Sequence, residues 1–192
     1  FKNQGTQLGY YHNTAYDKNK FIDLFGKTMG ENIYKNYNSW KGSCYGMALT
    51  SQLFYHNRLD SSLFGTVIDQ NTENVYGLQA PAGKKNKKLR DLIDYMHLTQ
   101  FLAKYNGYNS GNTYKSTENN MANLVQELLE NKQNYIMRIY GDGGHAVVPL
   151  KIKASGEDKY AIDIYDVNEP GKIVTAAVDT KQNTFRYESF NQ

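Results

Sequence analysis

The stretch GSCYGMALTSQLFYH, residues 42–56, carries the single cysteine of the 192-residue chain, Cys44. The apolar residues that follow it recur at spacings of three and four: Met47, Ala48, Leu49, Leu53 and Phe54. This spacing predicts a helix that begins at the cysteine. A helix N-terminus carries about half a positive charge, so a thiol placed there ionises more readily and becomes a better nucleophile. The position of Cys44 is therefore typical of a reactive cysteine.

The residues around Cys44 also fit a substrate cleft. Gly42 and Ser43 are small and would let a substrate backbone approach closely, while Trp40 and Tyr45 would form bulky walls. The alternative is that Cys44 is an inert core residue, because free cysteines are often buried. The cysteine alone does not decide between these two interpretations.

Further along the chain, helical periodicity gives way to alternation. The spacing predicts an amphipathic helix over residues 89–101 that stops near Gly107, and another that Ser116 or Thr117 would cap. After Asn131, alternating patterns predict strands over residues 135–140, 146–153, 160–165, 173–178 and 184–187. The sequence therefore predicts a single α+β domain over 1–192, helical over about 1–132 and an antiparallel β-sheet over about 133–192.

Composition excludes several classes of protein. The formal net charge of +3 is too small to predict nucleic-acid binding, and the basic cluster at residues 84–88 is typical of a solvated loop. No apolar run approaches the roughly 18 residues that a membrane span requires. One cysteine excludes an internal disulfide, and one cysteine with scattered histidines has no metal-ligand spacing, so we expect no metal and no cofactor.

A nucleophilic cysteine needs a base, and His145 is the best of the four histidines. It follows Gly143 and Gly144 and opens an apolar strand, which would hold the ring rigidly and leave it reachable through the glycine turn. A hairpin would bring the strand at 160–165 alongside, so that Asp166 at its end could orient the imidazole. Asn168 is the alternative orienting residue.

Three motifs resemble the papain-like cysteine peptidases. GSCYGMA resembles their nucleophile segment, GHAVV at 144–148 resembles their His-Ala-Val strand, and YDVN at 165–168 is most similar to the Phe-Asp-Pro-Asn element of the bacterial effector branch. The resemblance covers about 20 residues and implies a papain-like fold, with a helical lobe led by the Cys-bearing helix packed on the sheet. It also implies a Cys44, His145 and Asp166 triad. Asn38 stands where the family carries an oxyanion-stabilising glutamine.

The resemblance implies a peptidase that acts on protein or peptide substrates. The same triad also fits an acyltransferase, a transglutaminase-like cross-linker or an amidase, and a third alternative is an inactive binding module that keeps the fold. The Tyr-, Asn- and Lys-rich composition is typical of secreted proteins of low-GC Gram-positive bacteria. We therefore expect a secreted or surface-attached bacterial domain of a larger polypeptide.

Overall fold

A computed structural model describes residues 14–40, 42–64, 87–102, 118–130, 136–140, 144–169 and 172–188. The chain forms two compact units, residues 1–109 and 110–192, and each is described by itself. The described parts are a mixture of helices and an antiparallel sheet, so the predicted α+β class is confirmed. The prediction of a single domain stays a prediction.

The first unit is mainly helical. Its α-helices are α1 (Lys18–Phe25), α2 (Lys27–Asn36), α3 (Cys44–Tyr55) and α4 (Lys87–Leu98). Short 3-10 turns follow α3 at η1 (Ser61–Phe64) and α4 at η3 (Thr99–Phe101). Two short strands, β1 (Thr14–Ala15) and β2 (Ser39–Trp40), pair antiparallel and bring the segment before α1 beside the segment before α3.

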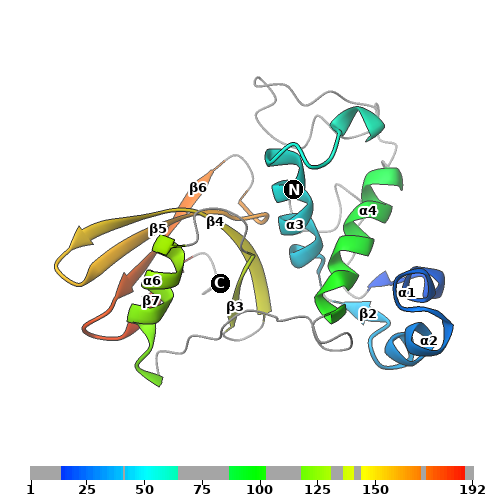
Figure 1. Ribbon diagram of the computed structural model, residues 1–192, viewed down its shortest axis with the longest axis horizontal. Helices are drawn as coiled ribbons and strands as arrows, with labels where there is room; N and C mark the ends of the chain where they lie inside the picture. The colour runs from blue at the N-terminus through cyan, green and yellow to red at the C-terminus, as the bar shows by residue number, and fades with distance from the viewer. Residues whose placement is uncertain are drawn as a thin grey trace. The chain divides into compact units, whose positions relative to one another are not determined.

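The helices of the first unit pack as two pairs (Figure 1). Gly26, at φ 76°, separates α1 from α2 and lets the chain turn back, so that the two helices enclose a small apolar core with the end of α4. That core consists of Tyr16, Phe21, Ile33, Leu98 and Phe101. The second pair is α3 and α4. A Cβ atom at Gly46 would lie 2.2 Å from the carbonyl oxygen of Ile93, so only glycine permits this close approach of the two helices.

The second unit is a five-stranded antiparallel meander in the order β3-β4-β5-β6-β7. The strands are β3 (Met137–Tyr140), β4 (Gly144–Gly156), β5 (Lys159–Tyr165), β6 (Ile173–Asp179) and β7 (Thr184–Arg186). Helix α6 (Met121–Glu130) covers one face of this sheet (Figure 1). The apolar residues of that face alternate along each strand, as expected for a sheet with one buried face. They include Ile139, Val147, Ile162, Ile164, Ala176 and Val178.

The start of α6 is fixed by the far end of the sheet. The side-chain oxygen of Asn183, in the turn between β6 and β7, accepts a hydrogen bond of 2.9 Å from the backbone N–H of Met121. Asn183 has φ 52°, a left-handed conformation that asparagine tolerates better than most residues. One side chain therefore satisfies a helix N–H group and closes a hairpin at the same time.

The strand predictions agree with the structure to within a few residues, whereas the helix predictions differ more from the described elements. Helix α4 ends at Leu98, and the 3-10 turn η3 carries the apolar pattern on to Phe101. Helix α6 begins at Met121 and uses Asn183, whereas the predicted caps Ser116 and Thr117 lie outside the described residues, as does the predicted stop at Gly107. Within the described ranges, no helix has the length and apolar character needed to cross a membrane.

Candidate active site

Three polar side chains meet at one end of the sheet in the second unit. His145 opens β4, Asp166 follows β5 and Tyr187 follows β7, and β5 and β7 run in the same direction. All three continue the alternation of the apolar face: His145 lies two residues before Val147, and Asp166 two residues after Ile164. The buried face of the sheet therefore ends in a polar cluster.

The cluster is tightly hydrogen-bonded and almost fully buried. The Nε2 atom of His145 lies 2.7 Å from Oδ1 of Asp166, and the backbone N–H of Asn168 donates to the same oxygen at 2.7 Å. The hydroxyl of Tyr187 donates to Oδ2 of Asp166. The exposed fractions are 6% for His145, 1% for Asp166 and 4% for Tyr187. These donors compensate the cost of burying the carboxylate.

The hydrogen bonds keep Asp166 ionised. Burial alone would raise the pKa of this carboxyl, but the hydrogen bonds from His145, Tyr187 and the backbone N–H of Asn168 outweigh burial and lower its pKa below the ordinary value. An ionised Asp166 accepts the Nε2–H proton of His145. This fixes the tautomer in which Nδ1 is the basic nitrogen of the neutral ring.

Asp166, and not the Asn168 side chain, is the group placed to orient His145. The Nδ2 atom of Asn168 lies 3.4 Å from Nε2 of His145, farther than the carboxylate oxygen. Nδ2 and a protonated Nε2 are both donors, so this contact adds no hydrogen bond in the tautomer that Asp166 selects. Asn168 contributes through its backbone N–H. Asp163 forms an ion pair of 2.5 Å with Lys153 instead and lies outside the cluster.

In the first unit, Cys44 is the first residue of α3 and is partly exposed. The residue before it, Ser43, occupies the N-cap position but makes no side-chain cap. Its hydroxyl is 2.8 Å from the hydroxyl of Tyr16, and both residues are buried. Burial raises the pKa of Tyr16 above its usual value, so this group stays a neutral phenol. The Tyr16–Ser43 pair thus anchors the turn that presents the thiol.

His97 of α4 takes over part of the capping of α3. The backbone N–H of Gly46, in the first turn of α3, donates to Nδ1 of His97 at 3.4 Å. The imidazole is 3% exposed and stacks on Tyr16, with ring centroids 5.8 Å apart. Burial lowers the pKa of His97 to about 3, so the ring is neutral and Nδ1 can accept. His97 is therefore a buried structural residue of the first unit.

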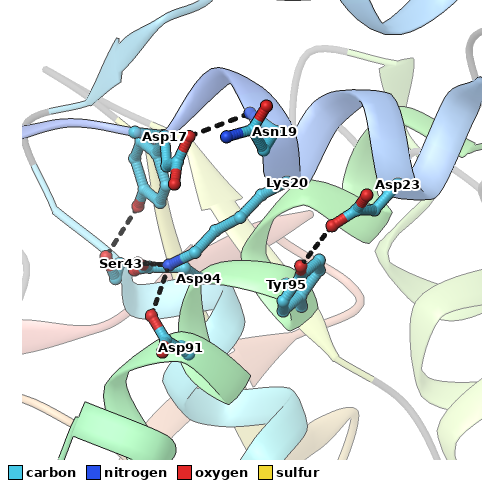
Figure 2. Close-up of polar contacts among 9 residues, drawn as sticks. Asp17, Asn19, Lys20, Asp23, Ser43, Asp91, Asp94 and Tyr95 are labelled. Carbon is cyan, nitrogen blue, oxygen red and sulfur yellow. Dashed lines mark hydrogen bonds and ion pairs between the residues drawn. The ribbon is translucent and has the colours of Figure 1, made fainter. Parts of the chain in front are cut away.

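A buried ion-pair cluster braces α1 against α4 beside this turn (Figure 2). The Nζ atom of Lys20 lies 2.8 Å from Asp91 and 2.5 Å from Asp94, and Lys20 and Asp94 are 9% and 7% exposed. The hydroxyl of Tyr95 donates to Asp23 at 2.8 Å and links the same two helices. These contacts fix the helix that carries His97 against α1.

The remaining predicted site residues are distributed over both units. Asn38 is exposed, and its backbone oxygen accepts from the Tyr16 N–H at 2.9 Å. Gly42 is half-buried, and Tyr45 packs edge-on against His97. Trp40 belongs to β2, but its side chain lies outside the described part of the chain. So does Gly143, whereas Gly144 pairs with Tyr140 at the exposed start of β4.

Sequence reasoning missed two tyrosines of the candidate site, Tyr16 and Tyr187. Each tyrosine contacts a partner that is distant in sequence. No local sequence pattern could predict the contact of Tyr16. The position of Tyr187 could have been predicted, because alternate strands of an antiparallel meander finish at the same end of the sheet. The residues after β7 therefore lie at the same end as those after β5.

Known proteins provide no further guide to the site. A scan against protein-family models found no match, and neither did searches of curated proteins and of solved structures. Among the residues that the structure describes, no group of three or more His, Cys, Asp or Glu side chains could hold a metal ion.

Proposed function

We propose that the chain is a cysteine peptidase of papain-like fold in which Cys44 is the nucleophile, His145 the base and acid, and Asp166 the orienting residue. The observation that carries the proposal is the His145–Asp166 pair. A buried imidazole donates through Nε2 to a carboxylate that two further donors, the Asn168 N–H and the Tyr187 hydroxyl, hold in place. This is the base-and-orienter half of a triad, because it directs the basic Nδ1 atom away from the carboxylate.

The local structure at Cys44 also supports the proposal. The thiol is partly exposed at the first position of a twelve-residue helix, at the positive end of the helix dipole. Tyr16, Ser43 and His97 fix this turn from the side of the core. The proposal requires that Cys44 of the first unit meet His145 of the second in the active protein.

In the proposed reaction, the Cys44 thiolate attacks the carbonyl carbon of a peptide bond, and the carbonyl π electrons move to oxygen. The backbone N–H of Cys44 and the side-chain amide of Asn38 would stabilise the resulting oxyanion. The intermediate collapses as the C–N bond breaks and the His145 imidazolium protonates the leaving amine. Water then attacks the thioester, gives a proton to His145 and releases the carboxylic acid and the thiolate.

Two alternatives use the same residues differently. With an amine as acceptor in place of water, the thioester would yield a transferred or cross-linked product, and with a side-chain amide as substrate it would release ammonia. A binding module would keep the sheet cluster without turnover. The substrates, a surface or secreted location in a bacterium, and membership of a larger polypeptide belong to the same proposal.

The experiment that tests the proposal is incubation of the chain with an unfolded protein mixture, followed by mass spectrometry of new N-termini. A peptidase produces N-termini that are absent with Cys44→Ala and with His145→Ala. Ammonia or cross-linked products without new N-termini would favour the amidase or transfer reaction. If none of these products forms, the binding-module alternative holds.

A further inference from the structure

We propose that Tyr187 is a positioning residue that holds the Asp166 carboxylate in the orientation in which Oδ1 faces Nε2 of His145. This inference deepens the proposed function and rests on it for its catalytic meaning. Its structural content lies entirely within the second unit. The starting observation is that the two oxygens of Asp166 have different partners: Oδ1 takes His145 and the Asn168 N–H, and Oδ2 takes the Tyr187 hydroxyl.

The need for a second anchor follows from the position of Asp166. It is the first residue after β5, beyond the last ladder pair of Tyr165 with Ile173, and its backbone oxygen accepts a turn hydrogen bond of 3.0 Å from the Glu169 N–H. These contacts leave the carboxylate free to rotate. Rotation about χ2 would exchange the two oxygens or lift Oδ1 out of the imidazole plane. The Asn168 N–H alone leaves that rotation open, whereas a donor on each oxygen closes it.

Tyr187 is well placed to be that donor. It is 4% exposed and belongs to the apolar core under α6, so its ring is fixed by packing and its hydroxyl has little freedom. The titratable groups that contact the Asp166 carboxylate are His145 and Tyr187. The phenol is neutral near pH 7, so it donates without cancelling the negative charge that His145 requires.

The test is NMR titration of the Asp166 carboxyl carbon in the full chain, in the native sequence and in Tyr187→Phe. Tyr160→Phe is the matched control, because Tyr160 is a half-buried tyrosine of β5 packed against the same core. Loss of one charge-assisted hydrogen bond is expected to move the Asp166 midpoint up by about one pH unit in Tyr187→Phe and to change the Nε2–H resonance of His145. Tyr160→Phe should change neither.

An unchanged Asp166 midpoint in a folded Tyr187→Phe protein would overturn the proposal. If that variant does not fold, the hydroxyl proton of Tyr187 in the native chain is the readout. Bonded to the carboxylate, its resonance should follow the Asp166 titration, and a resonance that ignores that titration would overturn the proposal equally. The alkylation rate of Cys44, measured in parallel with and without His145→Ala, reports on the peptidase proposal alone. Failure of that proposal is therefore separable from failure of this one.

Discussion

The buried, neutral state of His97 predicts a pH-dependent loss of stability in the first unit. Burial lowers the pKa of this imidazole from 6.5 to about 3, so between these values only the unfolded chain binds the proton. Stability is therefore full above about pH 6.5 and falls as the pH decreases towards 3. Each pH unit in this window lowers the free energy of unfolding by about 1.36 kcal/mol. Acidification to about pH 4.5 spans two units and costs about 2.7 kcal/mol.

The assay is urea unfolding at about pH 7.5 and about pH 4.5, followed by tryptophan fluorescence. The single tryptophan, Trp40, lies in β2 and so reports on the first unit. His97→Asn is the informative variant, because its Oδ1 can replace Nδ1 as acceptor for Gly46 and does not titrate. The variant loses the stacking on Tyr16 at every pH, a constant offset that cancels in the comparison.

When the pH is lowered, we expect the native chain to lose about 2.7 kcal/mol more of its free energy of unfolding than His97→Asn loses. The other titratable groups are the same in both proteins, so their contributions cancel in this difference. A difference that stays constant with pH would mean that the folded chain binds the proton on His97 as readily as the unfolded chain does, and that burial does not lower the pKa of this imidazole.

Substitutions at Asn183, Lys20 and Gly46, with Gly144 as a control position, test the packing of each unit by urea unfolding. Asn183→Gly should lower the free energy of unfolding by about 1 kcal/mol, because the α6 cap is lost. Asn183→Ala should lower it by about 1 kcal/mol more, because alanine is strained in the left-handed backbone conformation of this residue. Equal losses in the two variants would show that this strain is absent. Lys20→Met should cost about 3 kcal/mol, because it leaves two carboxylates of α4 without their cation. Gly46→Ala should cost at least about 2 kcal/mol through its contact with Ile93, whereas Gly144→Ala, which meets nothing closer than 3.7 Å, should be nearly neutral.

The sheet and its polar end were largely predictable from sequence. Alternation places His145 on the same face as Val147, and the glycines before it mark where that strand begins. The hairpin to the next strand then brings Asp166 to the same end. The choice of Asp166 over Asn168 required coordinates, since the two are separated by one residue and differ in which atom reaches the ring.

The first unit was harder to predict because polar residues build much of it. Helices α1 and α2 fall in the part predicted to be helical, but neither was located, since the segment is polar and Phe21 is among the few core residues that it supplies. Lys20 is buried only because Asp91 and Asp94 of α4 meet it, a pairing across more than seventy residues that no local pattern encodes. The hydrogen bond between Gly46 and His97 depends on how closely α3 and α4 approach, which helical periodicity does not encode.

The proposed joint action of Cys44 and His145 can be measured through the rate at which iodoacetamide alkylates Cys44. The rate would be followed by intact mass from about pH 4 to 9 in the native chain, in His145→Ala and in His56→Ala, a control at the other end of α3. We expect the alkylation rate of the native chain to be fast and constant down to about pH 5. This plateau should be lost in His145→Ala and kept in His56→Ala. A rate that rises only near the free-thiol pKa of about 8.5, and is the same in all three proteins, would contradict the proposed joint action.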